Sequence, residues 1–334
     1  MLTLDPIPLD HGPLRYFGGF DFTRDGRALI VGHFFQLDRA LTAWDTTSWV
    51  RRWSAPTRDT PVDVVVARDG PWVASVYGAP RGAPVWLWDV DTGAALRTVG
   101  ESHPLWGPLA ALPDERLLVG ERPSSGPASL SVWDARGGTL LRRCCGSADG
   151  VWAMAVDRPG ERVATYAQGR LSMWDLPSGD EVHDFGGAQG GWPSNCASVA
   201  PALAFHPAGD RVIVGGLVNE AGPAVFEAST GKKLGHLPGA RVESLASAVA
   251  VSPCGRWLVG TYGWQADDHW PWQDLGLRVW DLATGRLAQR VKMLGSPFAR
   301  LAFSPDGSLL VAGSTDGLQV WRVQMAAAAA PRAV

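Results

Sequence analysis

A pattern of short apolar segments and turns recurs seven times along the 334 residues of the chain. In each unit, two apolar segments flank a tight turn, and a third segment ends in an aromatic residue, usually within the pair Trp-Asp. The aromatic residues are Trp44, Trp88, Trp133, Trp174, Phe226, Trp280 and Trp321. Their spacing averages about 46 residues, and no window shows a sustained helical period, so the sequence predicts repeated units of β-structure.

Seven turns between the first and second segments match these aromatic residues in number and phase. Most of them combine Gly with Pro or Asp, which favour tight turns. They lie at 24–26, 68–70, 113–115, 158–160, 207–209, 253–255 and 305–307. One such unit cannot bury its apolar face alone, whereas a closed ring of units can. We therefore expect one domain despite the length of the chain.

Segments 277–285 and 301–321 resemble repeats of the WD40 β-propeller family, in a divergent, bacterial-type form. The resemblance covers residues 1–323 and implies an all-β, seven-bladed propeller with four antiparallel strands per blade. Because the last repeat has only three strands, residues 1–9 are expected to add the outer strand of the last blade and close the ring. Pro6 and Pro8 suit such an edge position. We expect a single propeller over 1–325 and an Ala-rich tail over 326–334.

The chain departs from that family in a buried hydrogen-bond network. Many members have a Gly-His pair before the first strand, whose His joins an Asp, a hydroxyl and the Trp. The matching stretches at 147–150, 239–241 and 295–297 contain no His. The hydroxyl position is Gly260 in the sixth repeat and Ala312 in the seventh. We expect the network to be missing there, with Trp280 and Trp321 acting as apolar anchors between blades.

Charge and composition exclude several classes of function. The net charge is −3 and no run of Lys or Arg exceeds two residues, which argues against nucleic-acid binding. No segment has the length of a membrane helix, and the N-terminus lacks the features of a signal peptide. Cys144, Cys145, Cys196 and Cys254 show neither metal-ligand spacing nor a disulfide framework, so we expect a cytoplasmic protein. Abundant Gly and Pro, and Arg in large excess over Lys, indicate a GC-rich, bacterial genome.

The sequence contains no catalytic motif for zinc proteases, serine hydrolases, phosphate loops or dinucleotide binding. Its seven histidines have no metal-ligand spacing, and His206 is expected to be a turn residue. The acidic segment 89–93 is predicted to be a turn rather than a calcium site. The expected innermost strands are mostly small or apolar, with Asp21 as the main exception. We therefore assign no catalytic residue, cofactor or metal ligand. A propeller hydrolase or lactonase with a site at the central channel is the alternative function.

Four insertions mark a candidate binding face. In the family that this chain resembles, loops between second and third strands, and loops entering each blade, lie on one face, here called the top face. The insertions are 33–38, 186–198, 217–222 and, longest, 262–275. The candidate partner-binding residues are Trp192, Trp264, Asp267, Asp268, His269, Trp270, Trp272 and Asp274. Tryptophans among polar residues are typical of binding hot spots, and the carboxylates favour a basic partner segment.

These observations predict an interaction scaffold or adaptor, monomeric by itself, that binds a protein or peptide on the top face near blades 4–6. Two alternatives concern the same tryptophans, which would either pack into a small core of their own loop or form a platform for a glycan or small molecule. A further alternative is a structural or sensory module in a complex, whose partners would stay bound if the loop were deleted.

Overall fold

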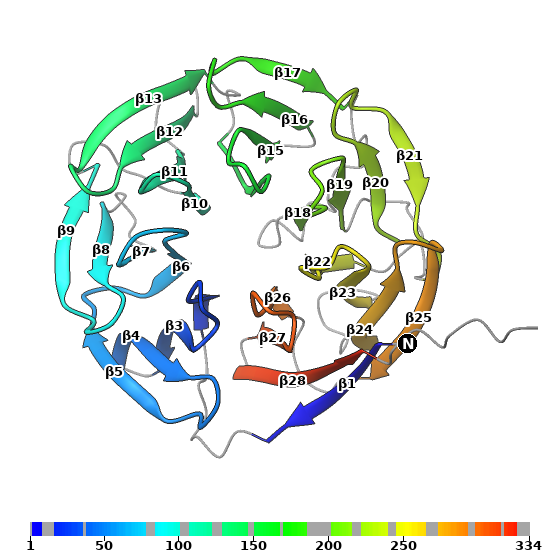
Figure 1. Cartoon of the computed structure of the whole chain (residues 1–334), viewed down its shortest axis with the longest axis horizontal. Helices are drawn as coiled ribbons and strands as arrows, with labels where there is room; N and C mark the ends of the chain where they lie inside the picture. Colours follow the sequence, from blue (N-terminus) through cyan, green and yellow to red (C-terminus); the bar gives the residue numbers. More distant parts are fainter. Residues whose placement is uncertain are drawn as a thin grey trace, which may run out of the picture.

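The chain forms seven four-stranded antiparallel sheets arranged as blades around a central axis (Figure 1). The computed structural model describes residues 2–8, 17–35, 38–77, 84–100, 107–121, 129–145, 150–167, 170–185, 202–215, 222–239, 245–264, 273–292, 298–314 and 317–325. Within these ranges all regular structure is strand, which confirms the predicted all-β, seven-bladed propeller.

Each of the first six blades takes four consecutive strands, with the first near the axis and the fourth at the rim (Figure 1). Blade 1 comprises β2 (Phe17–Phe22), β3 (Ala28–Phe35), β4 (Asp38–Asp45) and β5 (Arg51–Pro56), and blade 2 comprises β6 (Pro61–Val66), β7 (Trp72–Tyr77), β8 (Val85–Asp89) and β9 (Ala95–Val99). Blade 3 comprises β10 (Leu109–Leu112), β11 (Arg116–Gly120), β12 (Ser129–Asp134) and β13 (Thr139–Cys145), and blade 4 comprises β14 (Ala153–Val156), β15 (Arg162–Ala167), β16 (Arg170–Asp175) and β17 (Glu181–Asp184). Blade 5 comprises β18 (Leu203–Phe205), β19 (Arg211–Val214), β20 (Ala224–Glu227) and β21 (Lys233–His236), and blade 6 comprises β22 (Leu245–Val251), β23 (Trp257–Trp264), β24 (Gln273–Asp281) and β25 (Arg286–Lys292).

Blade 7 joins the two ends of the chain. Its strands β26 (Phe298–Phe303), β27 (Leu309–Ser314) and β28 (Gly317–Met325) are completed by β1 (Leu2–Ile7), which pairs antiparallel with β28 at the rim. Leu2 and Leu4 are buried between blades 6 and 7, whereas Thr3 is exposed. The alternation of strand side chains thus lets a short terminal strand both complete the sheet and add to the core. The predicted closure is confirmed.

The acidic residue of each Trp-Asp pair caps the turn into the fourth strand. In blade 2, the Asp89 carboxylate accepts hydrogen bonds from the backbone N–H and the hydroxyl of Thr92, at 2.8 and 2.7 Å. Its carbonyl accepts the N–H of Gly93, whose φ of 71° suits glycine. The same backbone bond recurs in blades 1–6. Segment 89–93 is therefore a backbone turn, as predicted, with the carboxylate engaged by the chain itself.

A bulge follows in every one of these six blades. The ladder between third and fourth strands shifts by one residue beside the aromatic residue, leaving one residue of the fourth strand unpaired. These six bulge residues are Arg52, Leu96, Leu141, Val182, Leu234 and Ala288. Such bulges twist an edge strand and hinder its pairing with another chain.

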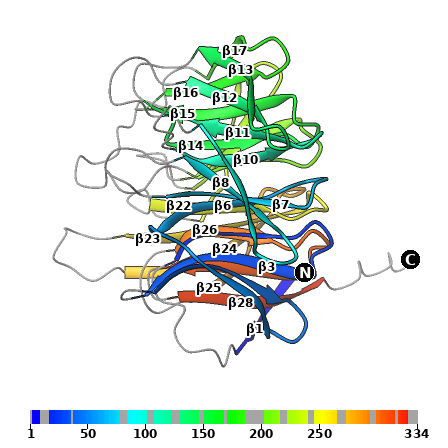
Figure 2. The ribbon, with the colours of Figure 1, turned by 90° about the vertical axis from the view of Figure 1, so that its left-hand side faces the viewer.

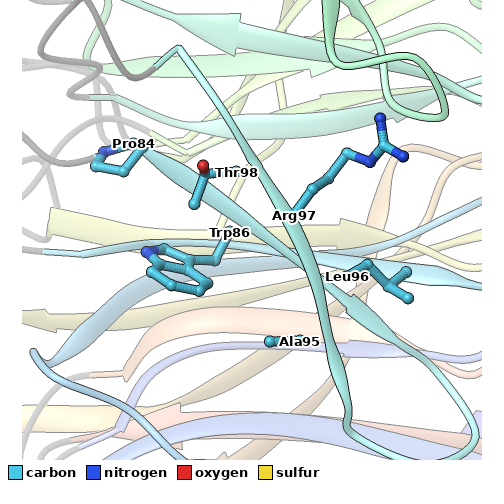
Figure 3. A pocket seen from close by; sticks show the side chains of 6 residues that line it. All are labelled: Pro84, Trp86, Ala95, Leu96, Arg97 and Thr98. Atoms are coloured by element: carbon cyan, nitrogen blue, oxygen red, sulfur yellow. The ribbon is translucent and has the colours of Figure 1, made fainter.

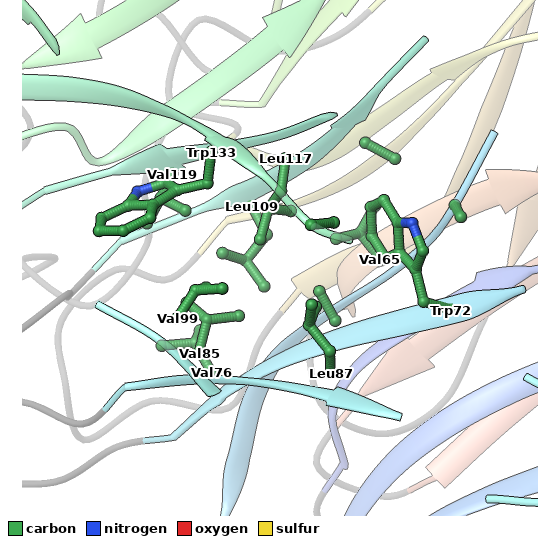
Figure 4. Close-up of a cluster of buried hydrophobic side chains, with 14 residues drawn as sticks. Val65, Trp72, Val76, Val85, Leu87, Val99, Leu109, Leu117, Val119 and Trp133 are labelled. Atoms are coloured by element: carbon green, nitrogen blue, oxygen red, sulfur yellow. The ribbon is translucent and has the colours of Figure 1, made fainter. Parts of the chain in front are cut away.

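The apolar core lies between blades, where the faces of neighbouring sheets meet. Figure 4 shows the cluster between blades 2 and 3, in which Val65 and Trp72 of blade 2 pack with Leu117 and Trp133 of blade 3. Each of the seven repeat aromatic residues lies in or against such a cluster. The repeated aromatic position therefore contributes its large apolar area where two blades meet.

The indole N–H of these tryptophans finds different acceptors in different blades. Ser75 on the second strand accepts from Trp88 at 2.9 Å, and Thr165 accepts from Trp174 at the same distance. In blade 6 the position equivalent to Ser75 and Thr165 is Gly260, and Trp280 donates instead to the carbonyl of Pro238 at 2.7 Å. The missing hydroxyl is thus replaced by a backbone acceptor from the preceding connection.

Two predicted insertions are shorter than the sequence indicated. In blade 1, His33–Phe35 and Asp38 belong to the paired strands β3 and β4, so strand pairing takes up both ends of the predicted insertion 33–38. Its apolar residues continue the strand pattern without Gly or Pro to stop it. In blade 6, β23 and β24 include both ends of the predicted insertion 262–275. The expected tail 326–334 lies outside the described residues.

Candidate functional site

The top-face candidates fall into two groups. Trp264 and Asp274 lie on the described backbone of blade 6, in β23 and β24. The other six candidates, Trp192, Asp267, Asp268, His269, Trp270 and Trp272, lie outside the described residues. The structure therefore shows which hairpin carries most of the predicted patch, and the patch itself stays a prediction.

That hairpin is built from two of the longest strands in the ring. β23 has 8 residues and β24 has 9, and their pairing continues to Trp264 opposite Gln273. A bulge between Tyr262 and Trp264 bends the ladder near its end. In Figure 2, β23 reaches the left-hand face of the disc. The backbone thus brings Trp264 and Asp274 to the same end of blade 6.

Tyr262 anchors the base of this hairpin. Its ring is buried against Trp280, with ring centres 5.4 Å apart, and the guanidinium of Arg278 lies 5.3 Å from its centre. Burial raises the pKa of the Tyr262 hydroxyl well above its ordinary value, despite the nearby positive charge of Arg278. The hydroxyl therefore stays protonated, and the ring fixes where β23 leaves the core.

A second constellation lines the centre of the ring, and the sequence analysis identified only part of it. Asp21 of β2 accepts the backbone N–H of Val66 in β6 at 2.9 Å. Asp63 of β6 accepts the N–H of Leu109 in β10 at 2.8 Å. Each carboxylate thus bonds the innermost strand of the next blade, whose inner edge has no neighbouring strand in its sheet.

Arg300 of β26 joins this chain of contacts from blade 7. One guanidinium nitrogen donates to the carboxylate of Asp63, and the other donates to the carbonyl of Val64 at 3.2 Å. The expectation that Asp21 is the main polar exception among the innermost strands is therefore wrong. Asp63 and Arg300 are further exceptions, and the three residues form a channel clasp that links blades 7, 1, 2 and 3.

The charged groups of the channel clasp shift each other's pKa values. Burial raises the pKa of Asp21, and the positive charge of Arg300 opposes this shift. Burial alone would lower the pKa of Arg300, but the carboxylates of Asp63 and Asp21 outweigh it and hold the pKa above its ordinary value. Since every group of the clasp already bonds within the chain, its geometry indicates a fastening between blades.

Similar links join the turns between the first and second strands of different blades. Arg68 of blade 2 donates to the carbonyl of Arg158 in blade 4 at 2.6 Å. Asp69 accepts the backbone N–H of Asp114 in blade 3 at 2.7 Å. His206 of blade 5 bonds the carbonyl of Gly255 in blade 6 at 2.9 Å. Its own carbonyl accepts the N–H of Gly209 at 2.7 Å, which agrees with its predicted role in a turn.

One feature of the sequence indicates the residues of the channel clasp. Asp63 and Arg300 each interrupt an otherwise apolar first strand, as Asp21 does. Their meeting had no local signal, because Asp63 and Arg300 are 237 residues apart in the chain. Only closure of the ring brings them together.

The described ranges contain no group of three or more His, Cys, Asp or Glu side chains arranged to hold a metal ion. Within the same ranges, no helix is long and apolar enough to cross a membrane.

Comparisons with known proteins agree with the architecture. Residues 295–321 match the family model described as WD domain, G-beta repeat, and this segment begins just before β26 and ends in β28. Autophagy-related protein 16 from Arabidopsis thaliana is 25% identical to this chain over 254 residues. That match covers 74% of this chain and 45% of the relative, so the chain spans less than half of that protein. Together with the seven blades of four strands, the matched repeat supports a WD40-repeat propeller family for this chain.

Proposed function

We propose that the protein is an interaction scaffold that binds a partner protein or peptide on the top face, at the end of the blade 6 hairpin. The observation that carries this proposal is the extension of β23 and β24, which ends at Trp264 opposite Gln273, next to Asp274. A hairpin anchored in the core at Tyr262 and Trp280 gives the segment between these strands a fixed base. Binding residues are often carried by loops that a rigid scaffold holds in position.

The chemistry of the segment fits a partner with a basic stretch. It contains Trp270 and Trp272 between Asp267, Asp268 and Asp274. Tryptophan offers a large flat surface for a guanidinium or ammonium group, and carboxylates beside it complete the recognition of positive charge. We further propose a cytoplasmic location and a monomeric free protein.

An enzyme with its site in the central channel has weaker support. The carboxylates of Asp21 and Asp63, which would be the natural acids or bases there, each accept a backbone N–H from the next blade. Asp63 is also paired with Arg300. Groups held in this way fasten blades together and offer little room for proton transfer to a substrate.

The proposal is tested by purification of the tagged protein from lysate of its source cells, with mass spectrometry of what is retained. The wild type is compared with Trp270→Ala/Trp272→Ala. A matched control, Val182→Asp/Leu234→Asp, changes two exposed rim residues of blades 4 and 5 instead. All three proteins are first checked for equal thermal unfolding.

A protein retained by the wild type and the control, and lost with the Trp270/Trp272 variant, supports the top-face site. Recovered binding of the same protein by Trp270→Phe/Trp272→Phe would show that the aromatic surface is what matters. If the same proteins are retained by all variants, the top-face site is wrong and the scaffold must bind elsewhere.

A further inference from the structure

The outer strands of blades 2 and 3 carry an unusual density of exposed apolar side chains. Leu96 on β9 is 50% exposed, and Leu140 and Leu141 on β13 are 41% and 53% exposed. Of the seven large hydrophobic side chains exposed within the described ranges, three lie on these two neighbouring strands. Isolated exposed aliphatic residues are ordinary, whereas several together mark an interaction surface.

The bulges explain why these side chains face solvent. Leu96 and Leu141 are the unpaired residues of their ladders, so each is turned outward where no neighbouring strand covers it. Blades 4 and 5 have Val182 and Leu234 at the same position, with similar exposure. Two further features distinguish blades 2 and 3 from blades 4 and 5. Blade 3 has the exposed Leu140 beside Leu141, and blade 2 has a groove.

The groove lies on the rim of blade 2 and has a volume of about 500 Å³. Trp86, Pro84 and Thr98 line one side of β9, and Arg97 and Leu96 extend on the other (Figure 3). The ring of Trp86 is only partly buried and stacks on Trp88 with ring centres 5.7 Å apart. The equivalent positions in other blades are occupied by Thr42, Ser131, Ser172, Ala224, Arg278 and Gln319, so this tryptophan surface belongs to blade 2.

Positive charge surrounds this surface. The outer strands β5, β9 and β13 contain Arg51, Arg52, Arg97, Arg142 and Arg143 and no acidic residue, although the whole chain carries a net charge of −3. Arg97 and Arg142 are exposed, and within the described ranges neither forms an ion pair with a carboxylate. The Arg142 guanidinium lies against the turn of blade 4, near Gly179, where its charge also lowers the pKa of Asp175, so Arg97 is the charge more available to a partner.

The outer strands of blades 2 and 3 are linked through Arg97. The Arg97 guanidinium lies over the turn that leads into β13, where a side chain at Gly138 would begin 3.6 Å from it. We call Leu96, Arg97, Leu140, Leu141 and Arg142 the rim patch. It presents aliphatic side chains flanked by the guanidinium groups of Arg97 and Arg142, beside a groove with an aromatic floor.

We propose that the rim patch binds a segment of a partner protein in which leucine-like side chains are interspersed with Asp or Glu. The apolar side chains would cover the three leucines and enter the groove beside Trp86, and the carboxylates would pair with Arg97 and Arg142. This site is separate from the top-face site and takes the opposite charge, so one molecule can hold two partners at once.

The test starts from a random peptide library displayed on phage and selected on the immobilised wild-type protein. The most enriched sequence is then synthesised with a fluorescent label, and its Kd is measured by anisotropy. The patch variant is Leu96→Asp/Leu141→Asp, and the matched control is Val182→Asp/Leu234→Asp, which changes the same bulge positions in blades 4 and 5. Arg97→Gln/Arg142→Gln tests the charges, and the unfolding temperature of each variant shows that the fold is kept.

We expect enriched peptides that combine acidic and large aliphatic residues. The patch variant should raise Kd at least about tenfold, as loss of hot-spot contacts does, while the control leaves it within about twofold. The arginine variant, like added salt, should also raise Kd, because charge attraction is screened. Three results would overturn the proposal: enrichment of no peptide or of peptides without acidic residues, equal binding to patch variant and control, or a wild-type dimer in ultracentrifugation that the patch variant dissociates.

Discussion

Single residues in the turns between first and second strands decide how well each turn is closed. In blade 7, the Asp306 carboxylate accepts the hydroxyl of Ser304 at 2.6 Å and the backbone N–H of Ser308 at 3.0 Å. Asp25 in blade 1 does the same with Thr23 and Arg27. Blade 6 has Cys254 at this position, whose thiol contacts the hydroxyl of Ser252 at 3.3 Å.

We therefore expect Cys254→Asp to stabilise the protein. The new carboxylate would accept the Ser252 hydroxyl and the Arg256 N–H, adding about 1 kcal/mol to the free energy of unfolding. Urea unfolding at pH 7 measures this gain. Cys254→Ala is the control and should change stability little. An unchanged midpoint for Cys254→Asp would mean that the blade 6 turn does not share the geometry of its counterparts.

At the scale of the element, the turn of blade 3 is the one without glycine. Asp114 and Glu115 adopt φ of 60° and 53°, in the left-handed region that disfavours side chains. The carboxylate of Asp69 in blade 2 holds this turn by accepting the N–H of Asp114 at 2.7 Å. A contact between blades thus stabilises a local conformation that the sequence of the turn opposes.

Glu115→Gly should relieve this strain and raise the free energy of unfolding by about 1 kcal/mol. The opposite change, Gly307→Ala in blade 7, places a side chain at φ of 74° and should lower it by a similar amount. Thermal or urea unfolding of both variants gives the comparison. A loss of stability in Glu115→Gly would show that the Glu115 side chain contributes more than the strain costs.

The terminal strand β1 offers a sharper test of ring closure. Leu4→Ala should cost about 2–4 kcal/mol, because Leu4 is 7% exposed and packs in the cluster of blades 6 and 7. Thr3→Ala, on the exposed face of the same strand, should cost less than about 0.5 kcal/mol. Equal effects in urea unfolding would mean that β1 is not packed as a structural strand.

The elements were predictable to different degrees for physical reasons. The turns and aromatic residues have local signals, so the number of blades and the closure by residues 1–9 followed from the sequence. The limits of the blade 1 hairpin did not, because Phe34 and Phe35 carry no stop signal where the loop was expected. The channel clasp depends on Asp63 and Arg300, which meet only in the closed ring. Most of the predicted top-face patch lies outside the described residues and stays a prediction.

At the scale of the whole molecule, acid stability should follow the turn carboxylates. A hydrogen bond from Arg52 holds the pKa of Asp45 well below its ordinary value, and bonds from Thr92 and Ser178 lower those of Asp89 and Asp175. A depressed pKa in the folded state adds stability above the unfolded pKa of about 4, and this stability is lost as the pH falls through the folded pKa.

The urea midpoint should therefore decline once the pH falls below about 4. Asp89→Asn should show a shallower decline than wild type. Thr3→Ala, which changes no carboxylate, serves as the control and should keep the wild-type profile. A profile that stays flat down to pH 3 would show that these turns contribute no pH-dependent stability.

The channel clasp should couple blades that are far apart in the chain. Arg300 keeps 31% of its side-chain exposure and Asp63 keeps 13%, so Arg300→Met should cost about 2 kcal/mol, less than loss of a fully buried partner. Asp63→Asn removes the same pairing. If the clasp links blade 7 to blade 2, the double variant Arg300→Met/Asp63→Asn will be more stable than the sum of the single effects predicts, by about 1 kcal/mol or more.

The loss of stability in Arg300→Met should depend on pH. Burial raises the pKa of Asp21, so the stability gained from its protonated form is complete at low pH and is lost as the pH rises through the folded pKa. Arg300 counteracts this loss because its charge favours the ionised form of Asp21. Arg300→Met should therefore destabilise the protein more at pH 7 than at pH 4.5, as measured by urea unfolding at both values. Strictly additive effects together with an equal cost at both pH values would mean that the clasp residues act separately and that ring closure rests on β1 and the apolar core alone.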